Sequence, residues 1–272
     1  MASDGAIADR TVVVAGGRRI SYREAGSGPA LVLLHGVGSG APSWDGQLAE
    51  FAPRWRTVAW DAPGYGGSDL LPMPSPAAAD YADALAGFLD ALGIDAAAVV
   101  GHSLGALVAA AFARRFPARV SRFVLADPAA GYGRLEPAER QSRVHGRLDL
   151  LRQYGPAGLA ERRSAALLTI NAPALARRRV REVMAAVRPD GYRAAVHMLR
   201  EADIFADLPP AAPALVMWGE ADGVTPPEAC RKVAEAIPGC KRASLPGLGH
   251  ACYVEDPEAF NRPLRAFLET SA

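Results

Sequence analysis

The sequence has few cysteines and none in a pattern typical of a metal site or a disulfide framework. Its 272 residues include three cysteines, at positions 230, 240 and 252, with no C-x-x-C spacing. An odd number of widely spaced cysteines argues against paired disulfides and against zinc. A reducing compartment fits this pattern. Because the sequence also shows no targeting signal, we expect a cytoplasmic protein.

The sequence also lacks an excess of charge of one sign and a long apolar run. Thirty basic and 29 acidic residues leave a net charge of +1, which gives no field to attract nucleic acid or anionic lipid. The first residues include Asp4 and Asp9 and do not resemble a signal peptide. The longest apolar helical stretch, residues 105–113, is too short to cross a bilayer. We expect neither nucleic acid nor a membrane as partner, and a homo-oligomer stays open.

What the sequence does contain is a regular alternation of strand and helix patterns. Apolar or alternating runs predict strands at residues 11–15, 19–25, 30–34, 57–61, 96–100, 122–126, 214–218 and 242–245. Helical patterns occupy residues 44–54, 80–92, 104–116, 227–237 and 257–268. The first two strands form an expected antiparallel hairpin. The rest predicts a mainly parallel sheet with helices on both faces, whose sites lie beyond the carboxyl ends of the strands.

Residues 129–207 interrupt this alternation. They show no strand pattern, and their helical patterns are broken at Gly155-Pro156, Ala172-Pro173 and Arg188-Pro189. We interpret them as a helical insertion in a core formed by residues 1–128 and 208–272. Clusters of arginine within the insertion predict a solvated helix face, and binding of a substrate carboxylate by an arginine of the insertion is the alternative.

The motif Gly101-His102-Ser103-Leu104-Gly105 follows an apolar strand and opens a helix. It matches G-x-S-x-G, in which a sharp strand-to-helix turn lifts the serine hydroxyl out of the sheet. A serine needs such exposure, and a neighbouring base, to act as a nucleophile. Ser103 is therefore the predicted nucleophile.

Acyl transfer also needs donors for the negative charge that develops on the carbonyl oxygen. Leu104 follows the nucleophile, and its backbone N–H is one candidate donor. The loop His35-Gly36-Val37-Gly38 follows an apolar strand, and the N–H of Val37 is the second candidate. We expect His35 to hold this loop rather than to act as a base.

A third member of the site must orient the base. The loop Trp218-Gly219-Glu220-Ala221-Asp222-Gly223 follows a strand and offers two acids. Asp222 lies in the turn and is favoured, whereas Glu220 is expected to face solvent. Asp127, at the end of the preceding strand, remains an alternative acid.

The predicted base is His250 in the loop Gly247-Leu248-Gly249-His250. A histidine on a glycine-flanked loop has little use in a core, and it completes the chain order Ser, Asp, His. Gly36, Trp44 and His102 are the candidates for contact with substrate, although packing is an equal alternative for Trp44. No cluster with metal-ligand spacing occurs, and we expect neither metal nor organic cofactor.

With these motifs in order, the chain resembles the α/β-hydrolase superfamily, in particular its serine esterases, lactonases and carbon–carbon bond hydrolases. Two further stretches, Asp61-Ala-Pro-Gly-Tyr-Gly-Gly-Ser68 and Glu255-Asp-Pro-Glu-Ala-Phe260, also match. The resemblance implies an α/β-hydrolase fold with a mostly parallel eight-stranded sheet. It further implies that residues 129–207 form a helical cap that sets specificity.

The resemblance implies a serine hydrolase that cleaves a carboxylic ester or lactone through an acyl-enzyme. The leucine-rich cap predicts a small to medium, partly apolar substrate. Carbon–carbon bond hydrolases usually carry asparagine before the serine and tryptophan soon after the histidine, where this chain has His102 and Ala251-Cys252. Carbon–carbon cleavage, a cofactor-free perhydrolase and a non-catalytic receptor for a small ligand remain alternatives.

Overall fold

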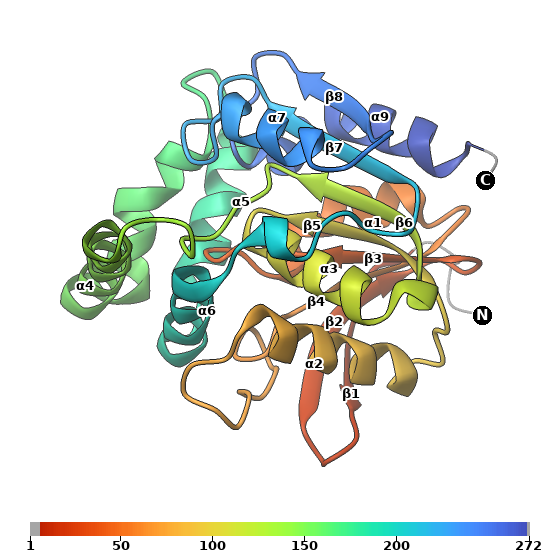
Figure 1. Ribbon diagram of the computed structural model, residues 1–272, viewed down its shortest axis with the longest axis horizontal. Helices are drawn as coiled ribbons and strands as arrows, with labels where there is room; N and C mark the ends of the chain where they lie inside the picture. The colour runs from red at the N-terminus through yellow and green to blue at the C-terminus, as the bar shows by residue number, and fades with distance from the viewer. Residues whose placement is uncertain (1–5, 271–272) are drawn as a thin grey trace.

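The computed structural model describes residues 6–270, which are built around an eight-stranded sheet (Figure 1). The strand order is β1-β2-β4-β3-β5-β6-β7-β8. The strands are β1 (Ala8–Val13), β2 (Arg19–Ala25), β3 (Ala30–Leu34), β4 (Arg56–Trp60), β5 (Ala97–His102), β6 (Val120–Ala126), β7 (Ala214–Gly219) and β8 (Lys241–Leu245). β1 and β2 form an antiparallel hairpin and β2 pairs antiparallel with β4, whereas all other pairs are parallel. The mostly parallel sheet predicted from the sequence is confirmed.

Helices cover both faces of the sheet, which is why its central strands are continuous apolar runs. Every residue of β5 and β7 is buried. One face packs against α2 (Ala78–Ala91), α3 (Leu104–Arg115) and α7 (Pro227–Glu235), and the other against α1 (Asp45–Phe51) and α9 (Pro257–Leu268). The last helix buries Phe260, Leu264, Phe267 and Leu268. Their spacing places one apolar stripe against the sheet.

Element boundaries differ from the sequence prediction at a few places. The first strand covers residues 8–13 rather than 11–15, because its pairing with β2 sets its length. The helix predicted at 44–54 is preceded by a 3-10 turn, η1 (Ala41–Trp44), with Pro42 in its first turn. The short helix α8 (Cys252–Glu255) was not predicted. Partner strands and tertiary contacts fix such boundaries, and neither can be read from local sequence.

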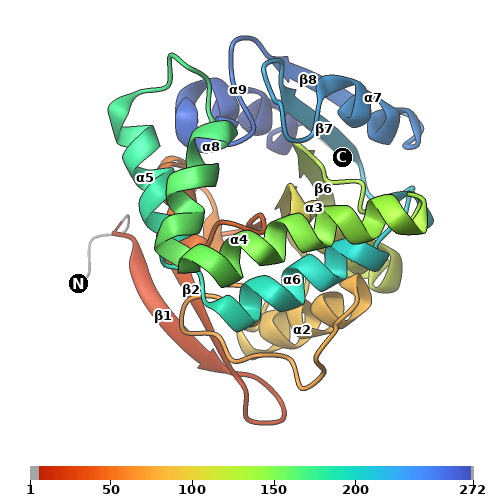
Figure 2. The ribbon, with the colours of Figure 1, turned by 90° about the vertical axis from the view of Figure 1, so that its left-hand side faces the viewer.

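Three helices lie in the segment between β6 and β7, which we call the inserted segment. They are α4 (Pro137–Arg163), α5 (Ala174–Ala185) and α6 (Pro189–Glu201). α4 lies against both α5 and α6 (Figure 2). The backbone of α4 is non-helical at Gly155, and Pro173 and Arg188 precede α5 and α6, so all three predicted breaks are present. Figure 1 shows the segment beyond the carboxyl ends of the parallel strands.

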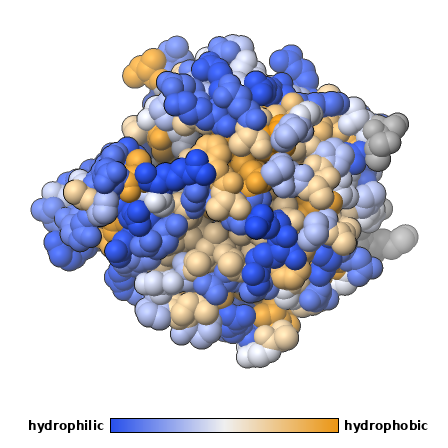
Figure 3. Space-filling model, viewed as in Figure 1, coloured by the Kyte–Doolittle hydropathy of each residue, from blue (hydrophilic) through white to orange (hydrophobic). Residues whose placement is uncertain are grey.

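The outer surface of the inserted segment is largely hydrophilic. Figure 3 shows this at the left of the molecule, around α4. The buried residues of α4 are few: Val144, Leu151, Leu159 and Ala160. No helix within residues 6–270 is both long enough and apolar enough to cross a membrane.

Candidate active site

Ser103 stands on a strained turn between β5 and α3. Its backbone has φ 52° and ψ −114°, a region that non-glycine residues rarely adopt and that costs of order 1–3 kcal/mol. The turn is possible because Gly101 and Gly105, two positions before and after Ser103, have no side chains. A Cβ on Gly101 would lie 2.4 Å from the carbonyl oxygen of Gly105, and a Cβ on Gly105 would lie 2.3 Å from that of Leu34. The Ser103 N–H donates to the Ala126 carbonyl at 3.0 Å, which ties the turn to β6.

Asp222 and His250 come from the loops that follow β7 and β8, and they are hydrogen bonded to each other. Nδ1 of His250 lies 2.8 Å from Oδ2 of Asp222. Burial acts to raise the pKa of Asp222, but its hydrogen bonds with His250, Thr225 and Val224 prevail and lower that pKa to about 2. An ionised carboxylate only accepts hydrogen bonds, so Nδ1 carries the proton and Nε2 is left as the basic nitrogen.

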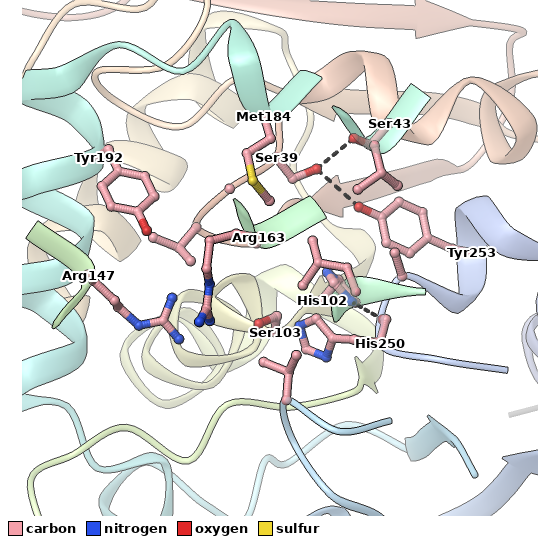
Figure 4. A pocket seen from close by; sticks show the side chains of 17 residues that line it. Ser39, Ser43, His102, Ser103, Arg147, Arg163, Met184, Tyr192, His250 and Tyr253 are labelled. Carbon is pink, nitrogen blue, oxygen red and sulfur yellow. Dashed lines mark hydrogen bonds between the residues drawn. The ribbon is translucent and has the colours of Figure 1, made fainter. Parts of the chain in front are cut away.

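Ser103 and His250 line one pocket, together with residues of the inserted segment. Figure 4 shows Ser103 beside His250 among the side chains that line this pocket. The side chains of Leu167, Val180 and Met184 contribute apolar walls from the inserted segment. The arrangement brings together the three residues that the sequence predicted as catalytic.

Of the two predicted oxyanion donors, one follows Ser103 in the chain and the other lines the same pocket. Leu104 is the first residue of α3, and Val37 lines the pocket. Within residues 6–270, neither backbone N–H donates to a carbonyl or side-chain acceptor. The Tyr65 hydroxyl donates to the carbonyl of Val37 at 2.7 Å, which fixes that loop. An oxyanion at Ser103 needs free N–H donors of this kind, and the assignment of both donors stays a prediction.

Asp127, the alternative acid, is engaged elsewhere. Its Oδ1 accepts from the Gly219 N–H at 2.9 Å, and its Oδ2 accepts from the Cys252 thiol at 2.9 Å. Burial raises the pKa of Asp127 well above its usual value, and the nearby charge of Asp222 adds to the rise. Glu220 is exposed, as expected. Of the three acids considered, Asp222 is the one that forms a hydrogen bond with His250.

Two further histidines are buried near the pocket. Nδ1 of His35 donates to the Gly36 carbonyl at 2.8 Å, and Nε2 accepts from the Ala62 N–H at 3.0 Å. It therefore bridges two loops as a neutral ring, the structural position expected for it. His102 lines the pocket, and its Nε2 lies 2.8 Å from the carbonyl of His250. Burial, aided by the neighbouring His250, lowers the pKa of His102 to about 3.

The candidates for substrate contact are placed differently. Gly36 and His102 line the pocket, whereas Trp44 does not. Trp44 is fully buried and stacks on Tyr253, with ring centroids 4.1 Å apart. The expectation that Trp44 contacts substrate is therefore wrong. It lies behind Tyr253, which does line the pocket, because the 3-10 turn η1 directs the indole into the core.

Several residues of the site were not assigned a role from the sequence. The Thr225 hydroxyl lies 2.7 Å from Oδ2 of Asp222 and 3.2 Å from Nδ1 of His250. The spacing Asp222-x-x-Thr225 is a pattern in which an aspartate accepts from the following backbone, and here it accepts from the Thr225 N–H at 3.0 Å. The buried carboxylate of Glu255 accepts from Gly249 at 3.0 Å and from the backbone and hydroxyl of Thr169. It links the inserted segment to the loop of His250.

Asp127, Asp222 and His250 each place a possible ligand atom within 4.8 Å of the others. These atoms already form hydrogen bonds with one another or with Gly219 and Cys252. A cation there would have to break those bonds in a buried setting. The possible ligand atoms of these three residues are therefore explained by the hydrogen bonds of the site.

Comparisons with known proteins agree with this geometry. The family model for the alpha/beta hydrolase fold matches residues 29–257. A 2-hydroxy-6-oxononadienedioate/2-hydroxy-6-oxononatrienedioate hydrolase of Burkholderia vietnamiensis is 30% identical over 275 residues, covering 92% of this chain and 91% of the relative.

Two solved structures are also similar. The enol-lactonase of Burkholderia xenovorans is 26% identical with a TM-score of 0.85, covering 96% of this chain and 100% of the other. A thermophilic esterase of Thermogutta terrifontis, solved with malate bound, is 26% identical with a TM-score of 0.85. The match covers 96% of this chain and 98% of the esterase. The family and the names of these relatives support a hydrolase activity. The chain belongs to the alpha/beta hydrolase family.

Proposed function

We propose that this protein is a serine hydrolase that cleaves a carboxylic ester or lactone of a small to medium, partly apolar substrate. The observation that carries the proposal is the hydrogen bond of 2.8 Å between His250 Nδ1 and Asp222 Oδ2, because His250 also lines one pocket with Ser103. Similarity to a protein named as an esterase and to one named as an enol-lactonase supports the same reaction class.

In the proposed first step, Nε2 of His250 takes the hydroxyl proton of Ser103 while Oγ attacks the substrate carbonyl carbon. Asp222 holds the imidazole in the tautomer that leaves Nε2 free and stabilises the imidazolium. The N–H groups of Val37 and Leu104 donate to the oxyanion. Loss of one such donor is expected to raise the barrier by about 3 kcal/mol.

The carbon–oxygen bond of the ester then breaks, His250 gives the proton to the alkoxide oxygen, and the acyl group stays on Ser103. In a lactone this oxygen remains attached to the acyl chain. A water molecule then loses a proton to His250 and attacks the acyl carbon. The acid leaves and Ser103 regains its proton. These steps use only groups of this chain and water.

The test is hydrolysis of short ethyl esters and of five- and six-membered lactones, followed by titration of the acid released. We expect wild-type turnover and its loss in Ser103→Ala, with the variant folded by circular dichroism. Equal rates for the two proteins would contradict the proposal.

A carbon–carbon bond hydrolase is the second candidate, favoured by the 30% identity to the oxononadienedioate hydrolase. It would use the same serine. Incubation with a 2-hydroxy-6-oxo-dienoate separates the two candidates, because turnover of the dienoate in preference to every ester would favour carbon–carbon cleavage.

A further inference from the structure

Two arginines of the inserted segment extend into the pocket that holds Ser103. Arg147 and Arg163 both belong to α4, and both line the pocket. Figure 4 shows their guanidinium groups on one side of Ser103, with His250 on the other side. A substrate whose reacting carbonyl lies at Ser103 would therefore extend towards these two groups.

The two guanidinium groups have no carboxylate partner. Neither Arg147 nor Arg163 forms an ion pair within residues 6–270, and no Asp or Glu of that range lines the pocket. Most other arginines of the inserted segment do pair with acids. Examples are Arg140 with Glu201 at 3.1 Å, Arg143 with Glu139 at 2.8 Å and Arg179 with Asp45 at 2.9 Å.

Arg147 is also held in place. Its Nε donates to the hydroxyl of Tyr132 at 3.1 Å, and Tyr192 is a second hydrogen-bond partner of its guanidinium group. Both arginines are half-buried. Because a guanidinium stays charged at any physiological pH, two of them in a partly enclosed pocket favour an anionic group between them. A carboxylate matches the planar fork of donors that each arginine presents.

We propose that the substrate is itself an anion: an ester or lactone that carries a carboxylate, held by Arg147 and Arg163 while its carbonyl lies at Ser103. The walls formed by Leu167, Val180 and Met184 would contact the carbon chain between the two groups. This inference rests on the proposed function for the position of the carbonyl, but the anion site itself does not depend on catalysis.

The test compares monoethyl glutarate with ethyl valerate, two ethyl esters that differ by a terminal carboxylate in place of a methyl group. We expect wild type to favour the glutarate by at least about 10-fold in kcat/KM. Arg147→Gln and Arg163→Gln should each lower kcat/KM for the glutarate by about 10- to 100-fold, the range for a lost charge-assisted hydrogen bond. Activity on the valerate should change by less than about threefold.

Arg162→Gln is the matched control. Arg162 is the neighbour of Arg163 on α4, but its guanidinium lies over the ring of Tyr154, 3.4 Å from the centroid, and is exposed. We expect no change on either ester. Equal wild-type activity on both esters, or equal losses on both in the glutamine variants at the pocket, would overturn the inference.

Calorimetric binding to Ser103→Ala separates this inference from the proposed function. We expect monoethyl glutarate to bind the variant, ethyl valerate to bind at least 10-fold more weakly, and Arg163→Gln added to the variant to remove the difference. Glutarate binding without any wild-type ester hydrolysis would support the anion site and contradict the hydrolase proposal. Hydrolysis of neutral esters without preferential glutarate binding would overturn the anion site and leave the hydrolase proposal standing.

Discussion

Nδ1 of His250 and Oδ2 of Asp222 lie 2.8 Å apart, and both side chains are buried. The two residues come from loops that follow different strands, β7 and β8. Hydrogen bonds from the Val224 and Thr225 N–H groups hold the other oxygen of Asp222 at 2.6 and 3.0 Å. The carboxylate is thus fixed on both sides, and with it the orientation of the imidazole.

Replacement of Asp222 should therefore impair activity far more than replacement of Asp127. Asp222→Asn is expected to lower kcat by about 10³- to 10⁴-fold, because an amide facing Nδ1 favours the wrong tautomer. Asp127→Asn keeps an oxygen for the Gly219 N–H and should cost less than about 10-fold. Steady-state kinetics on one ester measure both, and the reverse order would show that Asp127 is the orienting acid.

The tight turn at Ser103 predicts that two Gly→Ala substitutions have opposite effects on the free energy of unfolding. Gly105→Ala places a Cβ 2.3 Å from the Leu34 carbonyl and should destabilise the fold by at least about 1–3 kcal/mol. Gly87→Ala lies within α2, where a Cβ meets nothing within 4 Å, and should stabilise it by about 1 kcal/mol. Urea unfolding measures both free energies. A tolerated Gly105→Ala would contradict the close packing of α3 on β3.

Glu255 is expected to couple the inserted segment to the loop of His250. Glu255→Gln replaces one acceptor oxygen by a donor that faces Gly249 or Thr169, and should cost about 1–3 kcal/mol. Ester hydrolysis by Glu255→Gln should also fall, because the loop that carries His250 loses this support. A double-mutant cycle with Thr169→Val should give a coupling of at least about 0.5 kcal/mol. Additive effects would mean that the two residues do not act on each other.

His102 predicts a loss of stability in mild acid. Its pKa is about 3 in the folded protein, against about 6.5 for an unperturbed histidine. Between these values the unfolded chain binds a proton that the folded protein does not, so stability falls as the pH falls below 6.5. At pH 5 the loss due to His102 is about 2 kcal/mol.

His102→Gln tests this pH dependence, because its amide can still donate to the His250 carbonyl but does not titrate. Urea unfolding at pH 5 and pH 7.5 should show a smaller loss for the variant, by about 2 kcal/mol. Parallel losses in the two proteins would show that His102 is charged in the folded state.

Much of the fold could be predicted from the sequence because its signals are local. The apolar run of β3 and the G-x-S-x-G turn at Ser103 each specify a strand end and the loop that follows. The position of Trp44 could not be predicted, because its burial depends on the aromatic ring of Tyr253, more than 200 residues away in the chain. The same holds for Arg147 and Arg163, since only the packing of α4 over the sheet shows which arginines of the inserted segment face Ser103.

The central claim is that Ser103 is an activated nucleophile. Reaction with a fluorophosphonate probe tests it most directly, with the mass of the intact protein and of its peptides measured afterwards. We predict a single adduct on Ser103 in the wild type and none in Ser103→Ala or in heat-unfolded protein. A folded wild type that forms no adduct, or an adduct on another residue that persists in Ser103→Ala, would contradict the account.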